Sequence, residues 1–82
     1  MKHVVQLSGV LRDSAEGLES VEVEAETVRE LLNWMLQRFP DLNEHMDEGI
    51  AVSIDGEIFR DTWGKHLPQG AEIMLLPRIA GG

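Results

Sequence analysis

The feature that most constrains the fold is a single amphipathic helix, expected to begin at Thr27 and to end before Pro40. The tetrapeptide Thr27-Val28-Arg29-Glu30 has the form of a capping box, in which the hydroxyl accepts from the Glu30 amide and the Glu30 carboxylate reaches back. Pro40 ends the pattern because the residue before a proline disfavours the α region. Apolar side chains recur at helical spacing and form one stripe, which consists of Val28, Leu31, Leu32, Met35, Leu36 and Phe39.

Upstream of this helix, alternation of apolar and polar residues predicts two strands joined as a hairpin. Val5, Leu7 and Leu11 fall on one face of the first strand, which places Gly9 at a bulge or a close backbone approach. Turn residues fill 13–17, and a second alternating segment covers 18–24. The short connection is typical of an antiparallel pair.

The segment after the helix predicts two more strands and a tight turn. Residues 41–48 are acidic and loosely helical, with Leu42 and Met46 as apolar anchors. A third strand at 50–54 and a fourth at 57–59 flank Asp55-Gly56, a pair typical of type I′ hairpin turns because both central positions need a positive φ.

The last strand is expected at 71–76, after an irregular segment, 60–69, in which Trp63 and Leu67 plug the core. Ile73 and Leu75 are predicted to face inward, and Pro77 to stop the strand by withdrawing a ladder donor. The element order is therefore β-β-α-β-β-β, an α+β fold with one main helix across a mixed sheet. In this order the first and last strands can pair in parallel at the sheet centre. We expect one domain over 1–76 and a flexible tail over 77–82.

Composition excludes several classes of function. The formal net charge of -8 argues against nucleic-acid binding, which needs a basic face. The absence of cysteine removes disulfides and any thiol of the chain's own. No signal-peptide or membrane-spanning run is present, so we expect a cytoplasmic protein that makes no membrane contact. The histidines lack ligand spacing, so no metal site is predicted; they are His3, His45 and His66. No residue set supports acid–base catalysis, and we expect no enzyme activity and no bound cofactor.

The chain's last residues suggest a different kind of function. Gly81-Gly82 is a poor end for a structural element because glycine loses the most conformational freedom on ordering, but it makes a thin thread that enters a narrow slot. A frayed chain end is the plainer interpretation. The terminal carboxylate is a poor electrophile until it is adenylated, after which a sulfur nucleophile gives a thiocarboxylate. The chain has neither a nucleotide loop nor a thiol, so a partner that uses ATP would have to activate it.

The segments Gly70-Ala71-Glu72-Ile73 and Leu76-Pro77-Arg78-Ile79-Ala80-Gly81-Gly82 resemble the end of the MoaD/ThiS sulfur carriers, which are ubiquitin-like β-grasp proteins. Leu11-Arg12-Asp13 resembles the end of their first strand. The length and the ending are more similar to the small subunit of molybdopterin synthase than to the thiamine-pathway carrier. Departures at Ser8, Ala71 and Arg78 leave the sulfur acceptor open.

The resemblance implies that an E1-like enzyme adenylates Gly82 with ATP and that a covalent thiocarboxylate forms there. Gly81 and Ala80 would give the tail clearance, and the large subunit of molybdopterin synthase or another acceptor would take the sulfur in molybdenum cofactor biosynthesis. Other readings stay open: a carrier for thiamine or cysteine synthesis, a ubiquitin-like modifier joined through Gly82 to lysines, or a plain interaction module. The residues expected to contact partners are Ile58, Phe59, Met74, Leu76, Arg78 and Ile79.

Overall fold

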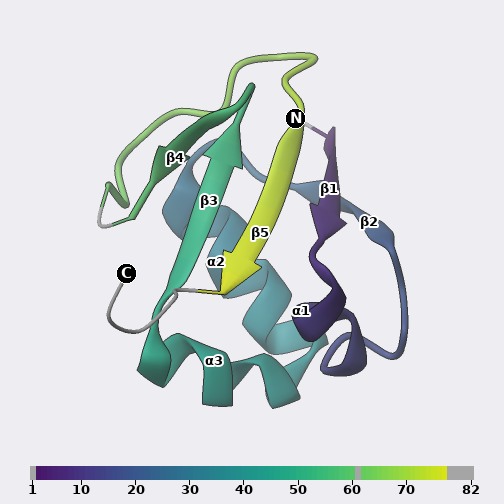
Figure 1. Ribbon diagram of the computed structural model, residues 1–82. Coiled ribbons are helices and arrows are strands. Elements are labelled where there is room, and N and C mark those ends of the chain that lie inside the picture. Colours follow the sequence, from purple (N-terminus) through teal and green to yellow (C-terminus); the bar gives the residue numbers. More distant parts are fainter. Residues whose placement is uncertain (1, 61, 78–82) are drawn as a thin grey trace.

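The computed structural model describes residues 2–60 and 62–77, with the backbone alone for 46–48. Two strands, each followed by a helical segment, precede three consecutive strands, as Figure 1 shows. The elements are β1 (Lys2–Leu7), α1 (Gly9–Asp13), β2 (Ser20–Glu24), α2 (Val28–Arg38), a short 3-10 helix (Pro40–Leu42), α3 (Asn43–Glu48), β3 (Ile50–Ile54), β4 (Glu57–Phe59) and β5 (Ile73–Pro77).

The strands form one mixed sheet in the order β2-β1-β5-β3-β4. β5 therefore lies at its centre, parallel to β1 and antiparallel to β3. Val5 pairs with Ile73 on one side of β5, and Val52 pairs with Leu75 on the other. The predicted parallel pairing of the first and last strands is confirmed.

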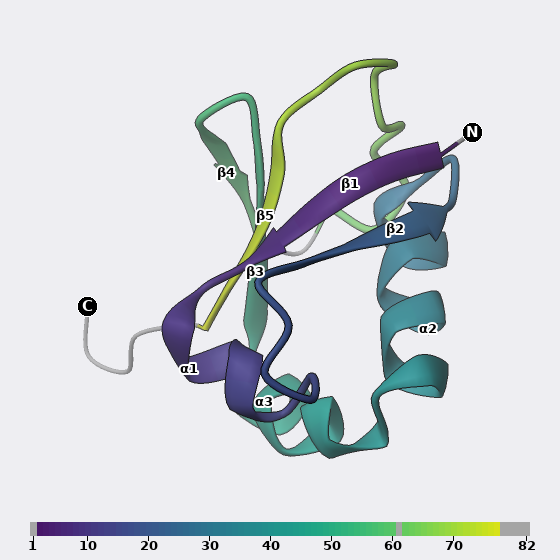
Figure 2. The same ribbon diagram turned by 90° about the vertical axis from the view of Figure 1, so that its right-hand side faces the viewer.

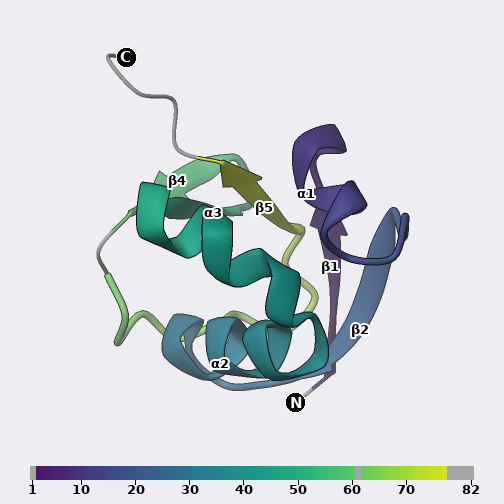
Figure 3. The same ribbon diagram turned by 90° about the horizontal axis from the view of Figure 1, so that it is seen from below.

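α2 packs across one face of this sheet, while α1 and α3 lie at the end of the sheet where β5 finishes (Figures 2 and 3). The predicted stripe of α2 supplies Val28, Leu31, Leu32 and Met35 to the core, and Leu36 packs against it. The sheet contributes its inward residues, among them Val5, Leu7, Val23, Val52, Ile54, Ile73 and Leu75. The α+β fold with one main helix across a mixed sheet is confirmed.

The start of α2 is held in two ways. Thr27 Oγ1 accepts from the Glu30 amide at 3.2 Å, as the capping pattern predicts. The return bond from the Glu30 carboxylate is not formed within the described part of the chain. Instead, Val28 N–H donates to Lys65 O and Arg29 N–H donates to Trp63 O, each at 3.0 Å. These bonds satisfy amides that a helix leaves unpaired at its beginning, and they fix the irregular 62–67 segment beside α2.

The expectation that the first strand continues to Leu11 is wrong. β1 ends at Leu7, and α1 begins at Gly9, with Arg12 N–H donating to Ser8 O at 3.0 Å. Leu11 still reaches the core, as the buried residue of α1. Gly9 is exposed, and nothing lies within 4 Å of the position that its Cβ would occupy, so no close backbone approach explains it.

The predicted hairpin turn at Asp55-Gly56 is confirmed. Asp55 and Gly56 have φ values of 51° and 86°, the positive values that a type I′ hairpin requires. Leu42 is fully buried below α2, whereas the side chain of Met46 lies outside the described residues. Leu67 is buried and Trp63 is half-buried against the core, so both act as the expected plugs.

Candidate functional site

The predicted tail leaves the fold from the end of its central strand. Arg78, Ile79, Ala80, Gly81 and Gly82 lie outside the described residues, so their roles stay predictions. Their attachment point can be described. Leu76 pairs with Ala51 of β3, and Leu75 O accepts from Ser8 N–H at 3.2 Å on the other side. The last described residues are thus held by neighbours on both edges.

Pro77 belongs to β5, although the sequence predicted that it would stop the strand and open the tail. Hydrogen-bonded and non-hydrogen-bonded pairs alternate in an antiparallel ladder. Asp55 N–H donates to Glu72 O at 2.9 Å, so by this alternation Ile50 and Pro77 form a non-hydrogen-bonded pair. On the other side the pairing with β1 ends at Leu75. The proline therefore removes no ladder bond, which is where a strand tolerates it.

The outer face of the sheet, away from α2, carries a row of side chains that crosses all five strands. Ile58, Ser53, Met74, Gln6 and Ser20 occupy directly paired positions from β4 to β2. Ile58 is 52% exposed, and Met74 is half-buried. Leu76 lies on the same face two residues further along β5, opposite the buried Ala51. The β3–β4–β5 half of this face is thus apolar and partly open to solvent.

The two predicted contact residues on β4 lie on opposite faces of the sheet. Ile58 lies on the outer face, whereas Phe59 is half-buried and packs against the core. Lys65 Nζ lies 5.2 Å from the centroid of the Phe59 ring, so a cation covers the side that the core leaves open. Ile58, Met74 and Leu76 are therefore the described candidates for an apolar contact surface.

Sequence reasoning missed two exposed apolar residues, Val4 at 54% and Val10 at 57%. The alternation that places Val5 on the inner face of β1 also places Val4 on the outer face, so the exposure of Val4 could have been predicted from the sequence. The same alternation set Val10 on the outer side, and Val10 is indeed exposed, although it lies in α1 and not in a strand. Ser8, expected on the outer face of the first strand, instead precedes α1, and its buried hydroxyl has no hydrogen-bond partner within the described residues.

A polar hollow continues the outer face toward β2. It has a volume of about 220 Å³ and is lined by Gln6, Arg12, Glu19 and Ser20. Arg12 Nε donates to Leu7 O at 3.0 Å, which orients the guanidinium at the end of β1. The outer face therefore combines an apolar half with a polar half that carries one positioned cation.

The remaining candidates for chemistry are histidine, serine and acidic side chains of the described residues. None of their histidine, aspartate and glutamate side chains gather in threes as a metal site would need. Ser14 and His45 form a Ser–His pair, with Oγ and Nε2 3.1 Å apart, and it joins α1 to α3. No helix within the described ranges is long and apolar enough to cross a membrane.

A mixed five-stranded sheet with one helix across it and a central C-terminal strand defines the ubiquitin-like β-grasp class. The profile of the ThiS family matches residues 5–82, so the chain belongs to this family of small sulfur carriers and ubiquitin-like proteins. No curated protein sequence matches the chain.

Solved structures of this class resemble the chain over its whole length. SAMP1 from Haloferax volcanii is 25% identical with a TM-score of 0.77, and the match covers 100% of both chains. The complex of subunits 1 and 2 of the molybdopterin-converting factor from Helicobacter pylori contains a chain 26% identical, with a TM-score of 0.69 and full coverage of both. A putative subunit 1 of this factor from Pyrococcus furiosus shares the fold at 20% identity and a TM-score of 0.79, covering 96% of this chain and 99% of that one.

Proposed function

We propose that this protein is a sulfur carrier whose Gly82 is adenylated and then converted to a thiocarboxylate. The observation that carries the proposal is the family match, which runs through the Gly81-Gly82 motif to residue 82. The chemistry of the chain agrees with this role. It has no cysteine, so the sulfur would be held on the carboxyl carbon and not on a side chain.

The proposed steps balance without any cofactor bound to the chain. The Gly82 carboxylate attacks the α-phosphate of ATP, which gives an acyl adenylate and releases pyrophosphate. A sulfur nucleophile from a donor then attacks the acyl carbon, so a C–S bond forms and the C–O bond to AMP breaks. If the donor is a persulfide, a second thiol attacks the donor-side sulfur of the resulting acyl disulfide, so the donor leaves in a mixed disulfide and the glycine carries a thiocarboxylate. Free sulfide gives the thiocarboxylate directly. An E1-like adenylating enzyme would supply the nucleotide site.

The fold suits a carrier because the residues directly before the tail are fixed. Ser8 and Ala51 hold β5 from either side at Leu75 and Leu76. A partner that docks on the outer face would therefore meet a tail that starts from a defined point. Placement matters for such transfers, since an error of about 1 Å can cost on the order of 100-fold in rate.

We favour molybdopterin synthesis as the destination of the sulfur, with this chain as the small subunit of the synthase and the large subunit as acceptor. What supports this is the Helicobacter pylori protein, which is 26% identical and forms a complex with subunit 2 of the same factor. On this proposal Ile58, Met74, Leu76, Arg78 and Ile79 contact the large subunit, and Gly81 and Ala80 keep the tail thin.

A second candidate function is that of a protein modifier. SAMP1 is 25% identical over the full length, and SAMP1 stands for small archaeal modifier protein 1. In that case the activated Gly82 carbonyl would be attacked by a lysine amine of a target, and an isopeptide bond would replace the bond to AMP. Both functions share the adenylate and differ in the nucleophile.

Intact-mass measurement after incubation with ATP, an E1-like enzyme and a sulfur source distinguishes these functions. The carrier gains the mass difference of one sulfur in place of one oxygen, and the modifier appears as higher-mass conjugates. Unchanged mass with an active enzyme and a working control carrier would contradict both. Adding the large synthase subunit and the pterin precursor then tests the acceptor, since sulfur should leave Gly82 in that mixture.

Deleting Gly82 is the matched test of the reacting group. The acyl carbon then moves back by one residue, about 3.5 Å of extended chain, so we expect sulfur loading to fall by at least about 100-fold. Gly81→Ala should reduce loading less, because a methyl group thickens the thread and restricts φ. The melting temperature of both variants should match that of the parent chain. Normal loading of the deletion variant would remove Gly82 from the proposal.

A further inference from the structure

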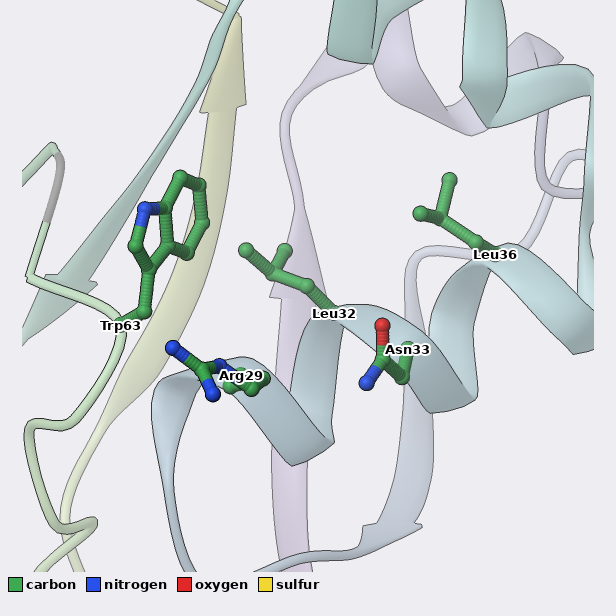
Figure 4. Close-up of a pocket in the computed structure, with 5 residues that line it drawn as sticks. All are labelled: Arg29, Leu32, Asn33, Leu36 and Trp63. Atoms are coloured by element: carbon green, nitrogen blue, oxygen red, sulfur yellow. The ribbon is translucent and has the colours of Figure 1, made fainter.

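A groove on the helix side of the molecule lies apart from the outer face and the tail. It has a volume of about 300 Å³ and lies between α2 and the 62–67 segment. Figure 4 shows side chains of α2 along one wall and the ring of Trp63 opposite them. The bond from Arg29 N–H to Trp63 O fixes this segment beside the helix, so the position of the second wall is set by the backbone.

The groove has an apolar floor. Leu32 is buried, while Leu36 and Trp63 are half-buried and pack against the core from its edge. Leu32 and Leu36 are four residues apart on α2, so their side chains lie in one row along the groove. A large apolar side chain from another molecule could bury surface against this row and the Trp63 ring, at about 25 cal/mol per Å².

The rim of the groove is polar and carries one charge. Arg29 and Asn33, also four residues apart, are exposed, and neither side chain has a hydrogen-bond or ion-pair partner in the described part of the chain. This sets Arg29 apart from Arg38, which pairs with Glu16 at 2.7 Å, and from Arg12, which donates to Leu7 O. A guanidinium presents donors that match both oxygens of a carboxylate.

The charge distribution indicates the sign of the occupant. The chain has a net charge of -8, yet Arg29 is the charged residue that lines this groove. Glu26 and Glu30, its acidic neighbours in sequence, do not line it. Lys65 does not line it either, and its ammonium lies over the Phe59 ring. A partner carboxylate would therefore be attracted here and repelled by most of the remaining surface.

We propose that this groove is a docking site for an acidic segment of a partner protein, which seats one apolar side chain between Leu32, Leu36 and Trp63 and places a carboxylate on Arg29 and Asn33. α2 packs on the inner face of the sheet, so the groove and the outer face belong to opposite sides of the molecule (Figure 2). A segment bound here would leave Met74 and Leu76 accessible to a second protein. The inference does not rest on Gly82 or on sulfur transfer.

Nuclear magnetic resonance titration with a defined peptide tests the proposal. The probe is the acetylated, amidated tetrapeptide Glu-Leu-Phe-Glu, and its matched control is the neutral peptide Gln-Leu-Phe-Gln. We expect both to shift the indole N–H of Trp63 and the amides of residues 29–36, with little change at Met74. The acidic peptide should bind about two- to fivefold more tightly, the range of an exposed ion pair.

Paired variants distinguish the contribution of the Arg29 charge to peptide binding from that of the apolar floor. Arg29→Gln should abolish the preference for the acidic peptide while the neutral one still binds, whereas Arg38→Gln makes the same charge change outside the groove and should keep the preference. Leu36→Asn should weaken both peptides. Thermal unfolding of each variant checks that it is folded. No shift at millimolar peptide, shifts confined to the outer face, or a charge preference that survives in Arg29→Gln would each overturn the docking site.

Discussion

The two faces of β5 carry similar side chains but differ in burial. Ile73 and Leu75 point toward α2 and are 2% and 0% exposed, whereas Met74 and Leu76 point the other way and remain half-buried. All four are large and apolar, so composition does not distinguish them. Only the register does, because side chains alternate along a strand.

This difference shows how one short strand can serve the fold and the function at once. The inner residues complete the core with the α2 stripe and specify where the strand lies. The outer residues are free of that requirement, so they can present apolar surface to a partner without loss of the fold. The comparison predicts that substitutions on the inner face lower the free energy of unfolding and that substitutions on the outer face weaken partner binding.

The largest effect on stability is expected from Leu75→Ala, which leaves a cavity at the centre of the core. We expect a loss of about 2–5 kcal/mol in the free energy of unfolding, measured by denaturant titration. The adjacent variant Leu76→Ala removes the same atoms from the outer face and should cost about 1 kcal/mol or less. Equal losses in the two variants would mean that the two faces of β5 are not distinct in energy.

The edge strand β4 repeats the comparison at smaller scale. Phe59 is half-buried against the core, so Phe59→Ala should cost about 1–3 kcal/mol, less than a fully buried phenylalanine. Ile58 is its outward neighbour, and Ile58→Ala should change stability by no more than about 0.5 kcal/mol. Chemical denaturation measures both. A larger loss at Ile58 would reverse the assignment of the two faces at this edge.

Partner binding should depend on the outer face and not on the inner one. Leu76→Glu places a charge in the apolar half of the outer face, and we expect about tenfold weaker binding to the activating enzyme with the fold retained, measured by calorimetry. Gln37→Glu adds the same charge at an exposed position of α2 and serves as control. Unchanged affinity in the Leu76 variant, or an equal loss in the control, would remove the outer face from the proposed interface.

A similarly small effect is expected from the ion pair between Arg38 and Glu16. Both side chains are more than half exposed, so solvent screens the pair, and Arg38→Gln should cost less than about 1 kcal/mol. The loss should shrink further at high salt. This value sets the scale against which an outer-face substitution counts as neutral. A salt-independent loss above that range would show that Arg38 acts through its packing over Phe39, 4.7 Å away, and not through charge.

Local patterns were enough to predict the elements whose signals are strong and unambiguous. The cap at Thr27, the apolar stripe of α2 and the Asp55-Gly56 turn each follow from chemistry confined to a few residues. The parallel pairing of β1 with β5 followed from element order alone. By contrast, Leu7 and Leu11 fit either a strand or a helical turn, and α1 is too short for propensity to decide between them.

The candidate site was predictable only in part, for a related reason. Alternation correctly separates Ile73 and Leu75 from Met74 and Leu76, but it could not choose between Ile58 and Phe59 without the register of β4 on β3. The groove at Trp63 was not foreseeable, because it depends on backbone bonds between α2 and a segment more than 30 residues away in sequence. No local pattern encodes that contact.

The parallel pairing of β1 and β5 also determines how the domain responds to mechanical force. Lys2 begins β1 and Pro77 ends β5, so a pull between the two ends of the described chain acts along the strands in opposite directions. Such a load is shared by the bonds of the ladder together, whereas a pull that opens a hairpin breaks its bonds one after another. When the domain is anchored at the start of β1, a pull on the end of β5 therefore loads these bonds in shear.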